Sequence, residues 1–405
     1  MLGKFNILIP NSTGPTNIGD QATLMPLVGL IKQVYPNANL TVHSTDPPLY
    51  EKRIAKNINN TLYSWGVFEN RNTLTRIYRI LLLLVTFWLL KLRFYIPLNN
   101  DLNLLIIDYK KADLIIFVGG GYLRSQKGIT QSLNLLMICL LFQYAKLFKA
   151  KKIITPLSFG PFAYGWQEKY VADVLQGFDV IAAREKISYQ HLKKNKVKNL
   201  VLSSDMALML NIEMAKRKKN KKFILGFTVR KWLNRREQHV FENSIIQAIV
   251  NFSEENKVII QPIVQVDAPN YGDVDFEVTR KIVKKLKAAG LKVLEIKKVT
   301  DLTKSIKIYS NIDLLLGMRM HSNILAILQG TPFVAISYEY KTQGIVSDLG
   351  MEDFFIKIED VNQENLYYLL MKAYMQKKYL ELRTLKKIKS LRKKENERWK
   401  EILGA

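Results

Sequence analysis

The sequence predicts an α/β protein with two Rossmann-like, doubly wound domains and a cleft between them. Three observations lead to this prediction. The chain has 405 residues, too many for one ordinary core. Its apolar runs are continuous rather than alternating and are separated by helical patterns, which is typical of parallel sheets covered on both faces. This alternation stops at a basic stretch, residues 211–222, and then starts again.

The first half of the chain, 1–210, forms the predicted N-terminal domain. An apolar run at 5–10 predicts a strand that ends at the turn Pro-Asn-Ser-Thr-Gly. Apolar residues at helical spacing predict a helix over 19–34. By the same criteria we expect further strands at 40–43, 113–118, 152–158, 180–183 and 200–202, and a helix at 132–148.

The second half starts with the basic stretch 211–222, which has no apolar periodicity and predicts a linker. The predicted C-terminal domain, 223–361, follows it. Residues 362–405 predict a long, basic helical segment. Within the domain we expect strands at 223–228, 257–263, 292–296, 312–316 and 333–337, and helices at 237–254, 274–289 and 320–328. Ligands of such folds bind at the carboxyl ends of the strands, which face the cleft.

The composition limits the classes of partner and site. Lys and Arg number 61 and Asp and Glu number 35, a net charge of +26. This charge attracts anionic partners, although a lysine-rich composition without a specific partner explains it equally well. The single cysteine, Cys139, excludes a disulfide framework and fits a reducing compartment. With 4 histidines in the chain, a metal site is not expected. The start of the chain reads as a strand rather than a signal peptide.

Within an apolar helix expected near 76–96, the most apolar stretch of the chain is 80–90, with cations on both sides. A helix of this length reaches about 16 Å, short of the ~30 Å of a bilayer core. Phe87, Trp88, Phe94 and Tyr95 suit the depth of lipid headgroups. A helix lying on an anionic membrane surface is therefore favoured slightly over a core helix.

Two glycine-containing loops follow predicted strands. Residues 16–22 open the first helix, where Asn17, Gly19 and Asp20 either hold an anion or acceptor or only cap the helix; capping is favoured on spacing alone. Three consecutive glycines, Gly119, Gly120 and Gly121, end the strand at 113–118. They predict a close approach of the backbone to an anion or sugar, with a tight turn as the alternative.

The strongest candidate site is Gly317-Met318-Arg319-Met320-His321-Ser322-Asn323, directly after an apolar strand. Arg319 offers a planar fork for a carboxylate or phosphate. A histidine side chain can give or take a proton near neutral pH, so His321 is a candidate acid or base. A helix-capping histidine beside a surface arginine is the alternative, but the position at the carboxyl end of a strand favours function.

Further cations follow other strands. Arg184 follows the strand at 180–183, Arg230 the strand at 223–228, and Lys341 the strand at 333–337. Each alone is more often a solvated charge, but together with Arg319 they predict an anionic substrate. Asp205 reads as a structural residue at the domain junction.

Taken in order, these motifs resemble those of the polysaccharide pyruvyl transferase family over most of residues 15–350. The ordered set is specific, although no single motif is. Gln21 stands where the family often has Glu, and Thr16 where a small residue is common. The motifs are Asn17-Ile18-Gly19-Asp20-Gln21-Ala22, Asp113 with Gly119-Gly120-Gly121, Ser158-Phe159-Gly160-Pro161, Ala183-Arg184-Glu185 with Ser188, Ser204-Asp205, Gly317-Met318-Arg319-Met320-His321-Ser322, Gly330-Thr331-Pro332 and Tyr338 through Lys341.

The resemblance implies a GT-B-like fold. It also implies transfer of the pyruvyl group of phosphoenolpyruvate to two hydroxyls of a sugar, which gives a cyclic ketal and free phosphate. This chemistry needs a proton donor and cations, so we expect His321 as general acid and Arg319 and Arg184 as anion clamps. We expect Asp20 to orient or deprotonate the acceptor. No cofactor or metal is expected. The expected donor-binding set is Arg184, Arg319, Arg230, Lys341 and Ser322.

Two other functions stay open. A nucleotide-sugar glycosyltransferase on the same fold would use a carboxylate such as Glu339 for the ribose. A basic, non-enzymatic adaptor at a membrane surface would explain the charge but not Arg319 and His321. No pattern supports nucleic acid as a partner.

The expected partners are phosphoenolpyruvate, a sugar or lipid-linked oligosaccharide acceptor, and an anionic membrane surface. Between 377 and 401 there are eleven Lys or Arg and four Glu, which adds attraction to anionic lipid. We therefore expect a cytoplasmic protein that is peripheral on the inner face of the membrane.

Overall fold

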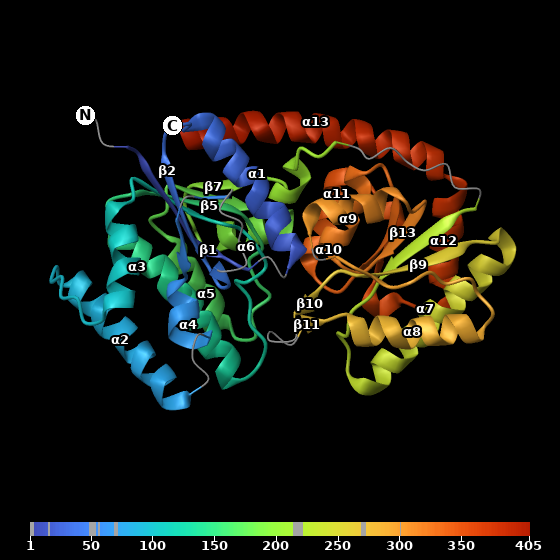
Figure 1. Cartoon of the computed structure of the whole chain (residues 1–405), viewed down its shortest axis with the longest axis horizontal. Helices are drawn as coiled ribbons and strands as arrows, with labels where there is room; N and C mark the ends of the chain where they lie inside the picture. Colours follow the sequence, from blue (N-terminus) through green and yellow to red (C-terminus); the bar gives the residue numbers. More distant parts are fainter. Residues whose placement is uncertain are drawn as a thin grey trace. The chain divides into compact units, whose positions relative to one another are not determined.

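The computed structural model describes residues 4–14, 17–47, 54–55, 57–68, 72–213, 222–268, 273–299 and 301–405. The chain divides into two compact units, and each is described by itself (Figure 1). Unit 1 comprises Met1–Pro15, Thr23–Met206 and Arg398–Ala405; unit 2 comprises Thr16–Ala22 and Ala207–Glu397. The division after Met206 lies just before the predicted boundary at 210. The predicted linker, 211–222, falls mostly outside the described residues.

Unit 1 is a parallel sheet of seven strands with helices between them. The strand order is β3-β2-β1-β4-β5-β6-β7, so the chain reverses direction across the sheet between β1 and β4. Its strands are β1 (Asn6–Ser12), β2 (Asn39–Ser44), β3 (Asn57–Asn60), β4 (Leu114–Phe117), β5 (Lys151–Leu157), β6 (Val180–Ala183) and β7 (Leu200–Leu202). Its helices are α1 (Ile18–Val34), which begins in unit 2, α2 (Thr73–Lys91), α3 (Asn100–Lys111), α4 (Ile129–Lys146), α5 (Gly165–Leu175) and α6 (Lys186–Lys194).

Unit 2 repeats this plan with a parallel sheet of six strands in the order β12-β9-β8-β13-β14-β15. The reversal of strand order falls between β8 and β13. The strands are β8 (Ile224–Thr228), β9 (Ile259–Val264), β12 (Lys297–Lys298), β13 (Leu314–Gly317), β14 (Phe333–Ser337) and β15 (Phe355–Lys357), besides a hairpin of β10 (Asp267–Ala268) and β11 (Asp273–Val274). The helices are α7 (Arg235–Asn256), α8 (Phe276–Ala288), α9 (Leu302–Ser310), α10 (Met320–Leu328), α11 (Tyr340–Leu349), α12 (Gln363–Met375) and α13 (Lys377–Gly404), which ends in unit 1.

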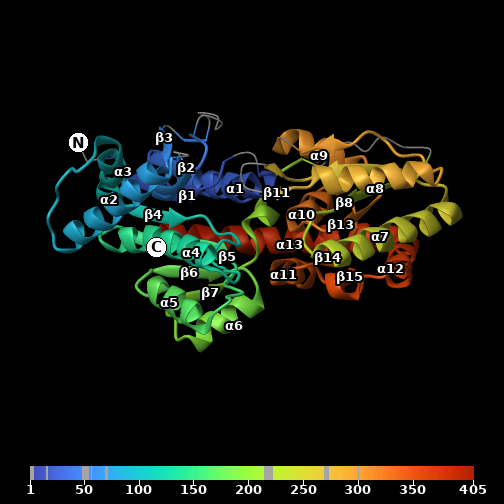
Figure 2. The same cartoon turned by 90° about the horizontal axis from the view of Figure 1, so that it is seen from below.

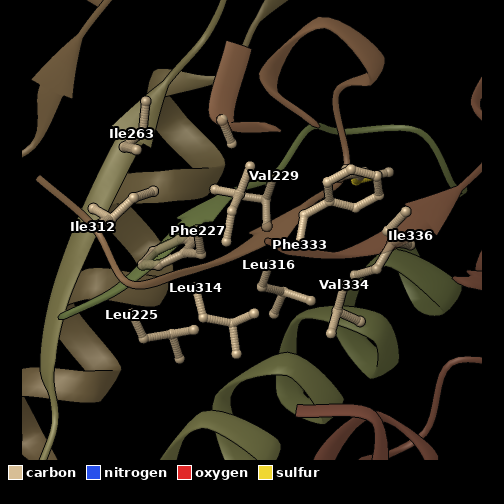
Figure 3. Packing of buried hydrophobic residues seen from close by; sticks show 14 of the residues in the cluster. Leu225, Phe227, Val229, Ile263, Ile312, Leu314, Leu316, Phe333, Val334 and Ile336 are labelled. Atoms are coloured by element: carbon tan, nitrogen blue, oxygen red, sulfur yellow. The ribbon is translucent and has the colours of Figure 1, made fainter. Parts of the chain in front are cut away.

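Each unit has its own apolar core, because its strands are covered by helices on both faces. In unit 2 the strands β8, β13 and β14 send Phe227, Leu316 and Val334 into the layers between sheet and helices (Figure 3). In unit 1 the core gathers Phe117, Phe142 and other side chains of β4 and α4. Continuous apolar strands are therefore buried on both sides, as the sequence predicts.

Three sequence-based boundaries are wrong for identifiable reasons. The first strand does not end at Pro10 but continues to Ser12, with an irregular register between Ile9 and Ser12. The predicted strand at 292–296 is reduced to a single bridge at Val293, and the edge strand β12 comes after it. An edge strand pairs on one side only, so its sequence is weakly constrained. The segment from 362 forms two helices rather than one.

Helix α2 lies at the periphery of unit 1, beside α3 (Figure 1 and Figure 2). It has 19 residues, long and apolar enough by composition to cross a bilayer, and it begins and ends a few residues earlier than the helix expected near 76–96. Its inner face packs in the core through Leu83 and Phe87, and the hydroxyl of Tyr144 donates to the Leu83 carbonyl. The expectation that Phe87 faces lipid headgroups is wrong, because that ring is a core side chain, 8% exposed.

The outer face of α2 is an apolar stripe at helical spacing. It consists of exposed side chains three or four residues apart: Leu74, Ile77, Tyr78, Leu81, Leu84, Val85 and Trp88. The chain that follows exposes Leu92, Phe94, Tyr95, Ile96 and Leu98 as well. Exposed apolar surface of this extent marks an interaction site.

Candidate active site

The site predicted around Arg319 and His321 lies at the carboxyl edge of the sheet of unit 2. Strands β8, β13 and β14 are neighbours there. Arg230 follows β8, Arg319 and His321 follow β13, and Lys341 comes after β14. Because the strand order reverses between β8 and β13, this edge is the place where open α/β sheets bind ligands. The structure thus brings together four of the residues that the sequence analysis selected.

Arg319 is held by a buried carboxylate that the sequence analysis did not select. Its Nε donates to Oδ2 of Asp275 at 3.0 Å, and its Nη2 donates to Oδ1 at 2.5 Å. Arg319 is 7% exposed and Asp275 is 1% exposed. A two-bond pair of this kind fixes the guanidinium in one plane and one orientation. Arg319 is therefore presented at the edge as a fixed group.

Asp275 is fixed in turn by the backbone after β9. Its Oδ2 accepts the N–H of Val266 at 3.1 Å, and its own N–H donates to the Val266 carbonyl at 3.0 Å. Val266 also pairs with Asn17 through an isolated antiparallel bridge. The first turn of α1, although it comes from the start of the chain, belongs to unit 2. It is thus tied to the same backbone that orients Arg319.

His321 stands in the first turn of α10, against the first turn of α1. A Cβ atom built on Gly19 would lie 2.1 Å from Nδ1 of His321, so only glycine leaves room for the imidazole. The N–H of Gly19 donates to Oδ1 of Asn17 at 3.0 Å, which shapes the turn. Asp20 lies in the same turn. The structure therefore unites Asn17, Gly19 and Asp20 with His321, which comes more than 300 residues later in the chain.

Ser322 and Asn323 form hydrogen bonds that hold this turn. The Ser322 hydroxyl donates to the Arg319 carbonyl at 2.5 Å and lies 2.9 Å from the hydroxyl of Thr228 on β8. Ser322 is fully buried, and its contact with Thr228 joins α10 to β8. Asn323 donates to the Gly317 carbonyl at 3.2 Å, and a Cβ on Gly317 would overlap its Oδ1. The donor-binding role of Ser322 stays a prediction.

The other cations of the edge surround an aromatic pair. The rings of Trp232 and Tyr338 lie 4.6 Å apart, and the guanidinium carbon of Arg230 lies 4.9 Å from each ring centre. Nη1 of Arg230 donates to the Tyr338 hydroxyl at 3.0 Å. Nζ of Lys341 lies 5.7 Å from the Tyr338 ring and forms an ion pair with Glu339 at 2.5 Å.

These charges change the acidity of Tyr338. Burial by itself raises the pKa of the phenol, but Lys341, Arg319 and Arg230 act against it, and the hydrogen bond from Arg230 adds to their effect. The outcome is a pKa lowered from 10.0 to about 8. A perturbed pKa at the carboxyl edge of a sheet is typical of a functional residue.

At the corresponding edge of unit 1, the ends of the strands are joined by bonds to the backbone and by close backbone packing. Asn11, at the end of β1, accepts from the Val118 N–H at 2.8 Å and donates to the Val118 carbonyl at 3.0 Å. A Cβ on Gly119 would lie 1.9 Å from the Pro156 carbonyl oxygen, so packing against β5 requires this glycine. Gly120 accepts from the Ser158 N–H, and Gly121 is half-buried. A ligand role for these glycines stays a prediction.

Arg184 also lies in unit 1, where the structure places it in a buried network. Its Nη1 donates to Asp205 at 2.8 Å, its Nε lies 3.5 Å from Glu185, and its Nη2 donates to the Ser158 hydroxyl at 2.5 Å. Arg184 is 3% exposed. Burial lowers the pKa of the guanidinium, but Asp205 and Glu185 outweigh it and raise the pKa. The structural role expected for Asp205 agrees with this geometry, and donor binding by Arg184 stays a prediction.

Asp275, Trp232 and Tyr338 are the site residues that sequence reasoning missed as functional groups. The sequence contained a clue to Tyr338, because this residue directly follows the buried strand β14, much as Arg319 comes two residues after β13. Asp275 carried none, since it precedes a helix in a region without apolar strands. Within the part of the chain that the structure describes, no group of three or more His, Cys, Asp or Glu side chains is placed to hold a metal ion.

Comparison with known proteins supplies the family. The sequence profile described as polysaccharide pyruvyl transferase matches residues 17–340, from the first turn of α1 to the residues after β14. The chain belongs to the polysaccharide pyruvyl transferase family. The resemblance inferred from the ordered motifs is therefore confirmed, and family membership makes the protein a transferase of polysaccharide modification. None of the curated proteins matches the chain.

Solved structures support the fold. A putative UDP-N-acetylglucosamine 2-epimerase from Listeria monocytogenes is similar with a TM-score of 0.58 and 11% identity, over 94% of this chain and 91% of that one. HepE from Anabaena, solved in complex with UDP-glucose, has a TM-score of 0.55 and 9% identity over 99% of both chains. An O-GlcNAc transferase from Thermobaculum terrenum has a TM-score of 0.52 and 10% identity, over 99% of this chain and 66% of that one.

At these identities the likeness concerns the fold alone. These neighbours are GT-B folds, and both units of this protein are parallel, doubly wound α/β sheets. The predicted fold class, two Rossmann-like domains of GT-B type, is confirmed. The predicted cleft stays a prediction, since each unit is described by itself.

Proposed function

We propose that this protein transfers the pyruvyl group of phosphoenolpyruvate to two hydroxyls of a sugar in a polysaccharide precursor, with release of phosphate. The observation that carries the proposal is the set of three cations, Arg230, Arg319 and Lys341, around Tyr338 at the carboxyl edge of unit 2, where His321 follows Arg319 by two residues. Phosphoenolpyruvate carries a carboxylate and a phosphate, so a site for it needs several cations at close range. A proton donor beside them completes the requirement.

In this proposal each residue has a separate task. Arg230 and Lys341 bind the phosphate and carboxylate, and Arg319, held in orientation by Asp275, adds charge at the reacting centre. His321 gives a proton to the methylene carbon while a sugar hydroxyl attacks the adjacent carbon. Asp20, in the turn that touches His321, orients the acceptor hydroxyl. No cofactor takes part in these steps.

The experiment mixes the protein with phosphoenolpyruvate and a panel of acceptors. The acceptors are p-nitrophenyl hexosides and lipid-linked oligosaccharides, and both phosphate and product mass are measured. We expect phosphate release only with an acceptor present, together with a product that has gained a pyruvyl ketal. Phosphate release without an acceptor would refute the proposal. Failure to release phosphate with any acceptor would refute it as well.

A nucleotide-sugar glycosyltransferase remains the second candidate, because solved neighbours with this fold are described with UDP or UDP-glucose. Its ribose-binding candidate, Glu339, is already paired with Lys341 at 2.5 Å. The pair is compatible with either candidate, since a carboxylate can accept more than one hydrogen bond and an ammonium can donate more than one. Thermal protection decides between them: we expect phosphoenolpyruvate to raise the melting temperature and UDP to leave it unchanged.

The location proposed for the protein is the inner, cytoplasmic face of a membrane, and its contact with lipid is the apolar stripe of α2. Cations border this stripe: Lys91 lies 4.5 Å from the Trp88 ring, and Arg93 is exposed just beyond it. Apolar side chains between cations match an anionic lipid surface, where apolar groups enter the headgroup layer and cations meet phosphates. A lipid-linked acceptor would be concentrated at the same surface.

Vesicle binding tests this contact. Vesicles of phosphatidylglycerol and phosphatidylcholine should bind the protein at low salt, and high salt should weaken the binding without abolishing it. Replacing Leu81, Val85 and Trp88 on the stripe with serine should remove most of what remains. Leu83→Val, on the core face of the same helix, is the matched control and should bind as the parent does. No binding at low salt would refute the location, and binding without any phosphate release would favour the adaptor function.

A further inference from the structure

Tyr338 lies at the carboxyl edge of the unit 2 sheet, and the proposed function has not yet assigned it a role. It directly follows β14, and β14 pairs with β13, which leads to Arg319 and His321. The Arg230 side chain reaches it from the end of β8. Three neighbouring strands therefore direct one cation or more toward this phenol, which is half-buried among them.

The hydrogen bond to Tyr338 fixes which way its proton points. A guanidinium can only donate, so Nη1 of Arg230 occupies a lone pair of the phenol oxygen at 3.0 Å. The O–H bond of Tyr338 must then point away from Arg230. The ring itself is held against Trp232, with the ring centres 4.6 Å apart. Tyr338 is thus an oriented proton donor.

The charges around Tyr338 favour loss of that proton. The cations that face it are Lys341, Arg319 and Arg230, and the carboxylates at this edge are engaged with two of them: Glu339 with Lys341 and Asp275 with Arg319. Together these groups hold the pKa at about 8 against the effect of burial. A proton donor is most effective when its pKa lies near the working pH, and an unperturbed tyrosine is too weak an acid.

We propose that Tyr338 gives its proton to the phosphate that departs in the second half of the pyruvyl transfer, and that the phenolate then takes the proton of the second sugar hydroxyl. This inference rests on the proposed function. It separates the reaction into two halves with one acid–base residue each: His321 for the first addition, and Tyr338 for the departure of phosphate and closure of the ketal.

The first half is balanced by His321 alone. His321 gives a proton to the methylene carbon of phosphoenolpyruvate, which becomes a methyl group. The first hydroxyl oxygen bonds to the neighbouring carbon, and its proton passes to His321. The result is a tetrahedral adduct that carries the methyl group, the carboxylate, the phosphate and the sugar oxygen. No bond to phosphate has broken at this stage.

The second half is balanced by Tyr338. The bond between the central carbon and the phosphate oxygen breaks, the electron pair leaves with that oxygen, and the oxygen takes the proton of Tyr338. The second hydroxyl oxygen bonds to the same carbon, and its proton goes to the phenolate. The products are the cyclic ketal and hydrogen phosphate, and both residues return to their starting states. Arg230 and Lys341 stabilise the phenolate between the two proton transfers.

The variant Tyr338→Phe tests this assignment, because it removes only the hydroxyl. With phosphoenolpyruvate and an acceptor that the parent uses, we expect phosphate release to fall at least roughly a hundredfold. The acceptor should instead accumulate as the adduct with a whole phosphoenolpyruvate, detected by its mass in a quenched reaction. His321→Gln should form neither adduct nor ketal. Tyr340→Phe, an exposed tyrosine on the next helix, is the matched control and should resemble the parent.

The pH dependence gives a second readout that a merely structural tyrosine would not change. A proton donor acts below its pKa and is lost above it, so kcat/KM of the parent should fall above about pH 8. The residual activity of Tyr338→Phe should lack this fall. An ultraviolet titration of the parent should show one tyrosine that ionises at lower pH than the others. This measurement does not need the variant, so it remains possible if Tyr338→Phe fails to fold.

Three outcomes would overturn the inference. Parent-like phosphate release by Tyr338→Phe would remove Tyr338 from the reaction. A slow variant that accumulates no adduct and keeps the alkaline fall would make Tyr338 a supporting residue only. If the ultraviolet titration of the parent shows no tyrosine that ionises ahead of the others, Tyr338 is not the proton donor. A parent that releases no phosphate with any acceptor would instead refute the proposed function, which is a distinguishable result.

Discussion

The two units share a strand order but differ in the charges at their carboxyl edges. In unit 1, Arg184 is enclosed by Asp205 and Glu185, and Asn11 bonds to the adjacent backbone. In unit 2, three cations converge on Tyr338, and His321, two residues after Arg319, lies against Gly19. The same topology therefore carries a buried ion network in one unit and a convergence of cations on a phenol in the other. A fold decides where a site can lie, and the residues after its strands decide whether one exists.

The largest expected effect is that of His321→Ala. We expect the variant to fold and its turnover to fall at least about a hundredfold, as loss of a general acid should. Steady-state kinetics and a thermal melt measure both quantities. His191→Ala in unit 1, whose side chain is 47% exposed and pairs with Glu168, is the control and should keep full turnover. Near-normal turnover of a folded His321→Ala would mean that unit 2 holds no proton donor at this position.

Arg319→Lys should have the next largest effect. A lysine keeps the charge but cannot make the two bonds to Asp275 that fix the guanidinium. Loss of one charge-assisted hydrogen bond is worth about 1.5–3 kcal/mol, so kcat/KM should fall roughly tenfold to a hundredfold. Arg280→Lys, in an exposed pair with Glu277, is the matched control and should change little. If both variants behave alike, the buried pair does not serve the reaction.

Gly19→Ala tests whether the start of the chain is part of the unit 2 site. The added Cβ would lie 2.1 Å from Nδ1 of His321, so the imidazole must move. Misplacement of a catalytic group by about 1 Å can cost a hundredfold in rate, and we expect a loss of tenfold or more. In the same helix Gly29 has open space, so Gly29→Ala should keep activity and stabilise the protein by about 0.5–1 kcal/mol. Equal activity of the two variants would contradict the contact.

Arg184→Lys should act mainly on stability. The lysine would leave part of the network of Asp205, Glu185 and Ser158 without a donor. We expect the free energy of unfolding to fall by about 1–3 kcal/mol, measured by urea denaturation. A raised KM for phosphoenolpyruvate in the folded variant would show that Arg184 also has the donor-binding role predicted from the sequence. The two carboxyl edges would then differ less in function than the ion network implies.

The sequence was sufficient for the fold because both sheets are buried on two faces. Short, continuous apolar runs between helical patterns are typical of strands buried on both faces. The strands β4, β6 and β14 have such runs, so their bounds were predicted almost to the residue. The polar strand β3 (Asn57–Asn60) was missed because it lies at an edge and pairs on one side only. Helix α2 was recognised, but the direction of Phe87 depends on the neighbours of the helix, which a local pattern does not contain.

The site was predicted in part for a related reason. Arg319, His321, Arg230 and Lys341 follow strands, and the ends of parallel strands can be read from the chain. The contact of Gly19 with His321 and the pair of Asp275 with Arg319 are long-range contacts between segments without periodicity. Nor could the acidity of Tyr338 be predicted, since it depends on cations from three separate strands. Residue types were visible in the sequence; their mutual orientation was not.

The central claim, that the carboxyl edge of unit 2 binds phosphoenolpyruvate, is tested most directly by calorimetric titration of that ligand. The parent is compared with the double variant Arg230→Gln/Lys341→Gln and with Arg280→Gln/Lys297→Gln, which removes two exposed cations from the same unit. We expect the first double variant to bind at least about a hundredfold more weakly, since each lost charge-assisted bond costs about 1.5–3 kcal/mol, and the second to bind like the parent. Equal affinity of the parent and the Arg230→Gln/Lys341→Gln variant would contradict the claim.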